Sequence, residues 1–427
     1  MIVAHDFPPL NTSASRRPYS WARTWSDMGH EVHVLTTAKY AHDSVAAGGP
    51  PIGGFRIHAV PYLPGVRPVE SPGDASPAAG RARRNRLLDA VRVATRRLRL
   101  GLGLFTEKTT LAYFPMRRAG LRLLAMQRFD LIVSTSGPDV CPLIAAALSR
   151  RGGVFWLSDY RDLWFDEFAV GRYAATTWFV NRLQSRLVRR ADLVSTVSRG
   201  LAGYLEPLAP GRVHVCYNGY LESAAAASVK RTDDARVRIV YTGTFYPRKR
   251  DPVLFFDALA ALRAAHPDLR DRFRVDCFGP VEEWVVRQVS QRGLASVVNF
   301  AGSVSYAESL AAQRGADVLL FVDWMDARAE GVLTGKLFEY LAAGRPILCI
   351  GSREDTEAVQ VIHDCGAGRV AVTQEQALLA LVDLASCSSR TSSETGLAAK
   401  FSRKAQALAL LERVREVMAT SGHAPTL

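Results

Sequence analysis

One short segment of the chain combines a lysine, a glutamate and a helix start in a way that suits a phosphorylated ligand. Thr334-Gly335-Lys336 precedes a stretch of helical apolar periodicity that stops at Gly344, so a helix is predicted at 336–343. The unpaired N–H groups and the positive dipole end of such a helix can hold a phosphate or diphosphate, and Lys336 adds a full charge. Glu339, one turn further, is placed to accept hydrogen bonds from sugar hydroxyls. The alternative is an ordinary helix with a glycine C-cap.

The bulk properties of the chain indicate a soluble protein of two or three domains. The chain has 427 residues, more than a domain with a single hydrophobic core usually contains, and 48% of them are apolar. No apolar run approaches the length of a membrane span, and no basic segment precedes the apolar start at Met1, so no signal peptide is expected. The six cysteines are scattered and never form Cys-x-x-Cys, which predicts buried thiols in a reducing compartment. We therefore expect a cytoplasmic location.

The net charge of +13 is unevenly distributed, because arginines crowd the segment between Arg81 and Arg99. Such density attracts phosphate groups. Leucines and valines interleave with the arginines, so the segment could lie as a basic amphipathic helix on an anionic membrane surface, at the inner face of the cell membrane. The alternatives are a solvated helix face and a nucleic-acid contact. No zinc finger or aromatic RNA-binding strand supports the latter, so we expect no nucleic-acid partner.

Several other chemistries lack their usual sequence patterns. There is no Asp-x-Asp pair and no His-x-x-x-His pair, so no protein-bound metal is expected. A Gly-x-Ser-x-Gly nucleophile turn is also missing. Gly335-Lys336 lacks the earlier glycine and the following hydroxyl of a Walker phosphate loop. The phosphate-binding segment at 334–336 therefore predicts an α/β protein that uses none of these three motifs.

Apolar segments bounded by turn residues predict two α/β domains. In the first, at 1–221, a helix is expected to begin at Pro18, and buried strands are expected at residues 2–4, 31–37, 130–136, 154–159, 192–198 and 213–219. A basic insertion, rich in glycine, proline and serine in its first half, interrupts this domain at about 40–125.

A small polar linker at 222–236 leads to a second domain at 237–400. Its strands are predicted at 237–243, 273–279, 297–301, 318–323 and 346–350. A helical tail at 401–427 is expected to pack back on the first domain. Each domain is therefore predicted to be a doubly wound, Rossmann-like parallel sheet, with the ligand site in the cleft between the two.

Four short segments resemble one enzyme family. They are His5-Asp6-Phe7-Pro8-Pro9, the stretch from Gly29 to Thr36, Asp159-Tyr160-Arg161-Asp162-Leu163-Trp164, and the segment that runs from Thr334 to Leu348. Together they are similar to the retaining glycosyltransferases of family 4, which have the GT-B fold. The resemblance covers most of the chain outside 40–125. It implies a hexosyltransferase that moves a sugar from a nucleoside diphosphate to a lipid-linked, polysaccharide or small-molecule acceptor, as in cell-envelope synthesis.

The resemblance implies a donor site in the second domain. Glu339 matches the family's ribose ligand, and Gly243 and Lys249 match a glycine and a lysine that face the diphosphate. The family's arginine after the glycine is Thr244 here, so that role would pass to Arg248 or Arg250. The other donor-binding residues implied are Gly279, Val304, Leu333, Thr334, Gly335 and Lys336.

Glu330 is the nearest candidate for a second glutamate that touches the donor sugar in this family. Eight residues separate it from Glu339, one more than the family's spacing. Either a bulge absorbs the difference, or backbone near Leu333 and Thr334 holds the sugar instead.

The resemblance implies an acceptor side in the first domain. The loop with Pro9, Asn11 and Ser13 keeps small residues but lacks the family's glycine pair. Asp159, Arg161 and Asp162 end a predicted strand, where they could orient an acceptor hydroxyl; an internal Arg–Asp pair is the alternative. In such enzymes the departing diphosphate can itself take the acceptor proton. No cofactor is required, and Mg²⁺ would be carried by the diphosphate.

Two other functions fit the same fold. One is a nucleotide-sugar epimerase, and the other is a non-catalytic nucleotide-sugar-binding partner of another transferase. The missing glycine pair, Thr244 and the displaced Glu330 favour the second of these rivals.

Overall fold

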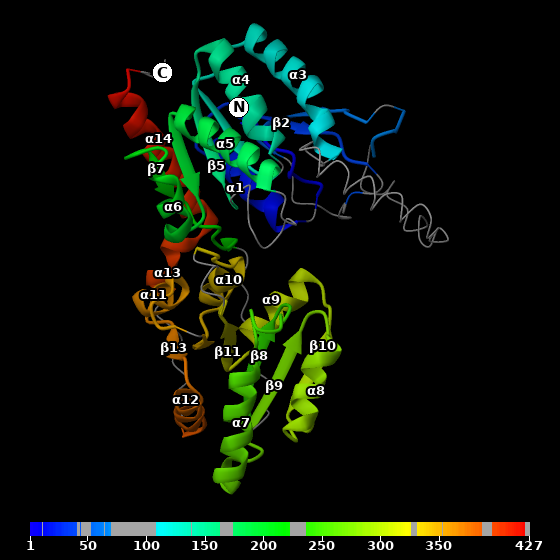
Figure 1. Ribbon diagram of the computed structural model, residues 1–427, viewed down its shortest axis with the longest axis vertical. Helices are drawn as coiled ribbons and strands as arrows, with labels where there is room; N and C mark the ends of the chain where they lie inside the picture. The colour runs from blue at the N-terminus through cyan, green and yellow to red at the C-terminus, as the bar shows by residue number, and fades with distance from the viewer. Residues whose placement is uncertain are drawn as a thin grey trace. The chain divides into compact units, whose positions relative to one another are not determined.

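The computed structural model divides the chain into two compact α/β units (Figure 1). The first consists of Met1–Tyr217 with Ala407–Leu427, and the second of Asn218–Gln406. The structure describes residues 1–10, 12–40, 43, 53–63, 65–69, 108–137, 139–162, 174–222, 236–325, 331–351, 353–386 and 395–422.

The first unit is built on a seven-stranded sheet in the order β3-β2-β1-β4-β5-β6-β7, in which every neighbouring pair is parallel. Its strands are β1 (Ile2–Val3), β2 (His33–Thr37), β3 (Arg56–Val60), β4 (Leu131–Thr135), β5 (Phe155–Tyr160), β6 (Leu193–Thr196) and β7 (Val213–Val215). Ile2 pairs with Val34 on one side and with Val133 on the other, so the winding reverses between β1 and β4. Ligands of doubly wound sheets bind at the carboxyl ends of the strands at this switch point.

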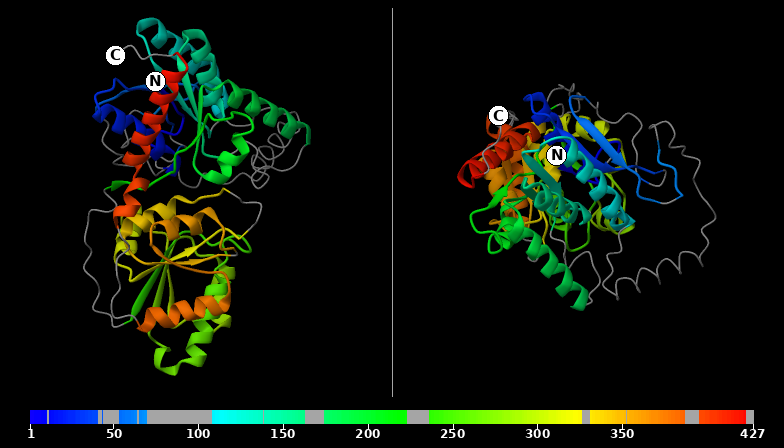
Figure 2. Two further views of the ribbon diagram at one scale, coloured as in Figure 1. Left: turned by 90° about the vertical axis from the view of Figure 1, so that its left-hand side faces the viewer. Right: turned by 90° about the horizontal axis from the view of Figure 1, so that it is seen from above.

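Helices cover both faces of this sheet (Figure 2). Val3 and Trp156 belong to the apolar core under α3, α4 and α5, whereas their neighbours Ile2 and Phe155 belong to the core under α1 and α14. Burial of alternate residues on opposite faces explains why the strands read as unbroken apolar runs. The helices are α1 (Ser13–Asp27), η3 (Lys108–Ala112), α3 (Tyr113–Met126), α4 (Val140–Gly152), α5 (Ala174–Arg190), α6 (Arg199–Leu205) and α14 (Arg403–Thr420).

Helix α14 ties the C-terminal segment to the first unit. Leu410 and Val414 pack with Trp21 and Trp25 of α1 in one apolar cluster. The indole Nε1 of Trp25 donates a hydrogen bond to the carbonyl of Ala407 at 2.9 Å. The last turns of the chain therefore complete the core that covers this face of the sheet.

Helix α1 begins earlier than the sequence predicts. It was expected from Pro18, but it starts at Ser13, because Thr12 caps it by accepting a hydrogen bond from the N–H of Ser15. Pro18 therefore lies inside the helix, where it removes one intrahelical hydrogen bond. The polar run before Pro18 concealed this first turn.

The range 40–125, predicted as an insertion, contains two elements of the sheet architecture. Strand β3 pairs with β2 along its whole length, and α3 packs over the sheet beside α4. The arginines between Arg81 and Arg99 lie outside the described residues.

The second unit repeats the same plan on a six-stranded parallel sheet in the order β10-β9-β8-β11-β12-β13. Its switch point lies between β8 and β11. The strands are β8 (Val237–Thr242), β9 (Phe273–Phe278), β10 (Val298–Gly302), β11 (Val318–Val322), β12 (Ile347–Ile350) and β13 (Gly368–Ala371). The helices are α7 (Val253–Ala265), η5 (Pro267–Leu269), α8 (Glu283–Gln291), α9 (Tyr306–Arg314), α10 (Gly335–Ala343), α11 (Glu357–Asp364), α12 (Gln374–Ser386), α13 (Thr395–Ala398) and η7 (Ala399–Phe401).

Three further findings concern the described residues only. None of their helices is long and apolar enough to cross a membrane. Five of the six cysteines lie among them, and all five are free, buried thiols. No group of three or more metal-ligating side chains gathers in this part of the chain.

Candidate functional site

Two glycines let the strand ends of the second unit approach one another closely. Gly243 follows β8 and donates its N–H to the carbonyl of Phe278 at 2.6 Å, while Gly279 follows β9 and donates to Gly302 at 2.8 Å. Both have positive φ angles, 137° and 141°. A Cβ atom on Gly279 would lie 2.1 Å from the carbonyl oxygen of Gly243, so no other residue fits there without moving the backbone.

Lys336 brings its ammonium group to the same place from the start of α10. A Cβ atom added to Gly243 would lie 1.5 Å from Nζ of Lys336, so the ammonium covers the open face of this glycine. The same Nζ lies 5.7 Å from the ring centroid of Tyr241. Burial, and secondly the nearby Arg250, lower the pKa of Lys336 to about 8, although Glu339 opposes this shift.

The N-terminus of α10 brings the positive end of the helix dipole beside this lysine. Thr334 caps the helix with its side-chain oxygen, which accepts from the N–H of Lys336 at 3.4 Å. Leu333 is buried and fixes the entry of the chain into the helix. The ammonium of Lys336, the backbone of Gly243 and the N-terminus of the nine-residue helix α10 therefore lie together at one end of the sheet.

One turn into α10, a buried polar network surrounds Glu339. Its Oε2 accepts from the side-chain amide of Gln313 on α9 at 3.4 Å. The same amide donates to Oγ1 of Thr242 at 3.1 Å, and the hydroxyl of Tyr340 accepts from the N–H of Thr242 at 2.9 Å. The end of β8 is thus hydrogen-bonded to two helices, which fixes the position of α10 relative to the Gly243 loop.

Two cations on the loop after β8 pack on an aromatic ring that follows β11. Nζ of Lys249 lies 5.6 Å from the ring centroid of Trp324, and the guanidinium carbon of Arg250 lies 5.3 Å from it. The carbonyl of Lys249 accepts from the N–H of Met325 at 2.6 Å. These contacts hold the basic loop at the switch point of the second unit.

A buried carboxyl group, that of Asp323, directly precedes Trp324 in the chain. Asp323 is 6% exposed and accepts from the hydroxyl of Thr356 at 2.7 Å. Burial raises the pKa of Asp323, although Thr356, the N–H of Trp324 and the charge of Arg250 oppose the shift.

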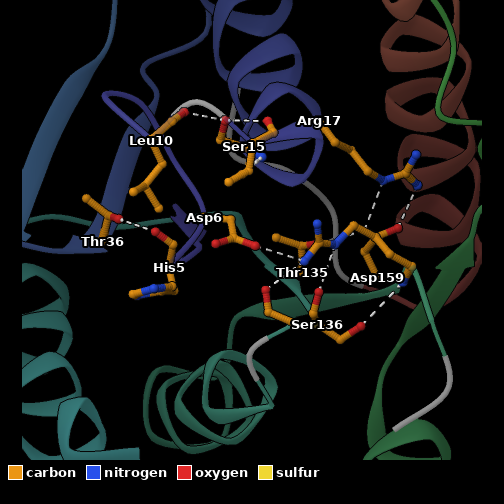
Figure 3. A network of polar contacts seen from close by, with 12 residues as sticks. His5, Asp6, Leu10, Ser15, Arg17, Thr36, Thr135, Ser136 and Asp159 are labelled. Atoms are coloured by element: carbon orange, nitrogen blue, oxygen red, sulfur yellow. Dashed lines mark hydrogen bonds and ion pairs between the residues drawn. The ribbon is translucent and has the colours of Figure 1, made fainter. Parts of the chain in front are cut away.

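In the first unit, the polar network at the switch point centres on a buried ion pair (Figure 3). Arg17 donates two hydrogen bonds to the carboxylate of Asp159, at 3.0 and 2.7 Å, and neither side chain is more than 2% exposed. Thr135 and Ser195 donate two more, at 3.0 and 2.8 Å. Burial disfavours the charge on Arg17, but Asp159 outweighs it and raises the pKa of Arg17. This pair joins α1 to β5, so the carboxylate of Asp159 is engaged in the interior. Of the two roles that the sequence analysis left open, an internal ion pair fits this geometry, and contact with an acceptor does not.

The ion pair gives a stability prediction. Replacing Asp159 by alanine leaves the Arg17 charge buried without a partner, and we expect the free energy of unfolding to fall by about 3–5 kcal/mol. Guanidinium denaturation of the variant measures this loss. The double variant Arg17→Met/Asp159→Leu, which removes both charges, is expected to recover most of the stability. A loss below about 1 kcal/mol for Asp159→Ala would contradict this role.

Nearer the surface, Arg161 and Asp6 form a second, partly exposed pair. Their side chains are 12% and 20% exposed and lie 3.2 Å apart. Arg161 also donates to the carbonyls of Ser136 and Gly137, at 2.9 and 2.6 Å. The loops after β1, β4 and β5 therefore meet at one ion pair that keeps some access to solvent. Asp162, next in sequence, is exposed.

A buried lysine supports the loop after β1. Nζ of Lys39 donates to the carbonyl of His5 at 2.6 Å and to the hydroxyl of Thr37 at 3.0 Å. Burial lowers the pKa of Lys39 to about 8. Burial, followed by the charge of Lys39, lowers the pKa of His5 to about 4, so His5 is neutral at pH 7. The backbone before Asp6 is consequently held in place.

The structure brings the predicted donor-binding residues together, apart from those it does not describe. Gly243, Gly279, Lys336 and Glu339 are linked by the contacts above, and Lys249 adjoins them through its neighbour Arg250. The remaining predicted residues lie around them: Thr244 and Val304 are half-buried on the neighbouring loops, Leu333, Thr334 and Gly335 open α10, and Arg248 is exposed with a φ angle of 59°. Glu330 and Asn11 lie outside the described residues. Pro9 is half-buried, and Ser13 is the first residue of α1.

Several residues at these sites were not singled out from the sequence. Asp6 and Lys39 had a signal, because each is a charged residue two or three positions after the end of a buried strand. Gln313 and Trp324 had none, since a glutamine in a helix and a tryptophan after a strand are ordinary. Arg17 pairs with a residue 142 positions away, which no spacing pattern reveals.

Comparisons with known proteins fit this architecture. Residues 13–219 match the family model of a glycosyl transferase 4-like domain. No curated protein matches the chain in sequence. Among solved structures, sucrose-phosphate synthase from Thermosynechococcus elongatus is similar over 98% of this chain and 100% of its own, with 16% identity and a TM-score of 0.61. HepE from Anabaena, solved with UDP, is similar over 99% of both chains, with 13% identity and a TM-score of 0.57. The lipopolysaccharide outer core galactosyltransferase WaaB covers 98% of this chain and is itself covered over 99%, with 11% identity and a TM-score of 0.56. At these identities the likeness concerns the fold.

Proposed function

We propose that the chain is a family 4 glycosyltransferase of the GT-B fold, because residues 13–219 match a glycosyl transferase 4-like domain. It would transfer a sugar from a nucleoside diphosphate donor with retention of configuration. The observation that carries the proposal is the meeting of Gly243, Lys336 and Glu339 at the switch point of the second unit. The diphosphate would lie against Gly243 and the start of α10, with Lys336 neutralising its charge. Glu339 would accept hydrogen bonds from the ribose.

The proposed reaction needs few protein groups. The bond from the sugar's anomeric carbon to the diphosphate oxygen breaks, and a bond to the acceptor oxygen forms on the same face of the sugar. The acceptor proton passes to the departing diphosphate. Lys249, with Arg248 or Arg250, would stabilise the negative charge that develops there. Glu330 is the proposed contact to the donor sugar. No resident cofactor is proposed, and Mg²⁺ would travel with the diphosphate.

We propose that the first unit carries the acceptor side. The Asp6–Arg161 pair presents a partly exposed carboxylate and guanidinium, which suits recognition of sugar hydroxyls. The loop with Pro9, Asn11 and Ser13, and the exposed Asp162, would frame the same place. The proposed acceptor is a lipid-linked molecule, a polysaccharide or a small molecule, and the proposed transferred group is a hexosyl group.

A turnover assay tests the enzyme proposal against its rivals. The protein is incubated with UDP-, GDP- and dTDP-sugars, and release of the nucleoside diphosphate is measured with and without candidate acceptors. UDP-glucose is a suitable first donor, because HepE was solved in complex with it. Transfer or slow hydrolysis that is lost in Glu339→Ala supports the proposal. Tight binding without turnover on any acceptor would instead indicate a non-catalytic partner, and release of an epimerised sugar would indicate an epimerase.

We also propose that the first unit touches an anionic membrane surface, as peripheral attachment to a lipid-linked acceptor would require. Helices α3, α4 and α5 contain no aspartate or glutamate, and α3 exposes Arg117, Arg118 and Arg122 beside Phe114, which is 75% exposed. Arginines with exposed aromatic rings suit a lipid headgroup layer.

Vesicle sedimentation measures this contact. The wild-type chain should bind vesicles of phosphatidylglycerol and not those of phosphatidylcholine. Replacing Arg117, Arg118 and Arg122 of α3 together with the arginines between Arg81 and Arg99 by glutamine is expected to reduce binding at least tenfold. Arg270→Gln, which removes one exposed positive charge from the second unit, is the control for a change in charge away from this surface, and its binding should be unchanged. Equal binding by the multiple variant and the wild type would refute the contact.

A further inference from the structure

Gln313 is a fully buried amide that contacts the proposed ribose ligand. It lies near the end of α9 and is 0% exposed. Its Nε2 lies within hydrogen-bond distance of three acceptors: Thr242 Oγ1 at 3.1 Å, Ser309 Oγ at 3.4 Å and Glu339 Oε2 at 3.4 Å. A primary amide has only two N–H groups. The three acceptors therefore compete for them, and the charged one, Glu339, is the strongest.

The other end of this amide is left without a partner. Oε1 of Gln313 is buried and accepts no hydrogen bond from the residues that the structure describes. An unpaired buried acceptor of this kind is destabilising, because it has given up its hydrogen bonds to water. Turning the amide over would set its carbonyl oxygen against the carboxylate of Glu339, so that two acceptors faced each other. The unpaired oxygen is thus the consequence of presenting an N–H to Glu339.

Glu339 is held on one side only. Its Oε2 faces Gln313, whereas no hydrogen bond to Oε1 is formed within the described part of the chain. The next residue, Tyr340, is fixed to the end of β8 through the N–H of Thr242. Glu339 thus projects from a rigid helix turn with one oxygen engaged and the other available to a ligand.

From this geometry we propose that Gln313 is a positioning residue that sets selectivity for ribose over deoxyribose. By holding Oε2, it turns Oε1 of Glu339 toward the ribose hydroxyls of the nucleotide. A freely rotating glutamate would hydrogen-bond to water instead, and would lose most of its discrimination between the two sugars. This inference rests on the proposed function of the second unit.

The expected results are ratios of dissociation constants measured by calorimetry. The probes are UDP and its 2′-deoxy and 3′-deoxy forms, with GDP and its deoxy forms as a second set. One hydrogen bond to a charged carboxylate is worth about 1.5–3 kcal/mol, so at least one deoxy form should bind wild type about tenfold or more weakly. Gln313→Met, which keeps the size of the side chain, should reduce this ratio at least threefold. Glu339→Ala should bring it to about one.

The ratio separates positioning from a purely structural role. If Gln313 only supports the fold, its replacement weakens the ribose and deoxyribose forms equally and leaves the ratio unchanged. Ser309→Ala is the matched control, because it removes another partner of the same amide without touching Glu339, and its ratio should equal that of wild type. Gln313→Leu, which also lacks the amide N–H, provides a second variant in case the methionine variant fails to fold.

The outcomes distinguish the inference from the function on which it rests. A ratio that stays at the wild-type value in both Gln313 variants but falls to one in Glu339→Ala overturns the inference and leaves the proposed function intact. Failure of wild type to bind any of the nucleotides, or an equal affinity for ribose and deoxyribose forms, overturns the ribose role of Glu339 and with it the inference.

Discussion

Replacing Lys249 by alanine is expected to lower the turnover number of sugar transfer by about 10²–10³-fold, the usual effect of removing one preorganised charge from a transition state. Nζ of this lysine is held over the ring of Trp324, and its carbonyl is tied to Met325. The ammonium is therefore in place before negative charge builds up on the leaving diphosphate. Because the charge grows only as the bond breaks, affinity for the nucleoside diphosphate should change less than turnover.

Steady-state kinetics over a range of nucleotide-sugar concentrations measures turnover, and calorimetry with the nucleoside diphosphate measures affinity. Arg270→Ala removes an exposed positive charge elsewhere in the second unit and should leave both turnover and affinity unchanged. Lys249→Arg keeps the charge and should retain more activity than the alanine variant. Equal loss of affinity and turnover in Lys249→Ala would assign this lysine to ground-state binding and contradict the role given to it here.

Affinity for a nucleoside diphosphate is expected to fall about tenfold between pH 7 and pH 9. Burial and Arg250 lower the pKa of Lys336 to about 8. With that pKa, the charged fraction of the side chain drops from about 90% at pH 7 to about 10% at pH 9. Because the ammonium lies over Gly243, its neutralisation removes the full charge nearest the proposed diphosphate.

The contribution of Lys336 to the free energy of unfolding changes with pH in the opposite direction to the affinity, so the two effects can be distinguished. An unfolded lysine has the ordinary pKa of 10.5, so between about pH 8 and 10.5 the unfolded chain binds more protons at this position. The contribution of Lys336 to the free energy of unfolding therefore rises with pH in that window, and the lost affinity would not reflect unfolding through this group. Lys336→Gln should bind weakly at both pH values, with no change between them. A wild-type affinity that is flat from pH 7 to 9 would contradict the role of Lys336.

Much of the sheet architecture could be predicted from the sequence. The strands at 131–135, 155–160 and 237–242 are apolar runs bounded by turn residues, and burial on both faces makes such runs continuous. Helix α10 was also predicted to within one residue, because Thr334 and Gly344 mark its two ends. These features depend on neighbours in the sequence.

What escaped prediction depends on residues far apart. β3 is an edge strand in which no side chain is fully buried, so it carries a weak apolar signal, and the sequence analysis included it in an insertion. For Asp159 the sequence left two alternatives open, an acceptor-orienting acid and an internal Arg–Asp pair, and its partner Arg17 lies 142 positions away. Gln313 gains its meaning from Thr242 and Glu339, which lie on other elements. Sequence periodicity contains no information about such contacts.

A crystal structure with a bound nucleoside diphosphate tests the central claim most directly. The nucleotide used would be whichever of the two ribonucleotides UDP and GDP binds more tightly. We predict that its diphosphate lies between Gly243 and the first turn of α10, within hydrogen-bond distance of Lys336, and that its ribose hydroxyls contact Glu339. A nucleotide bound elsewhere, with no ligand between Gly243 and α10, would contradict the account.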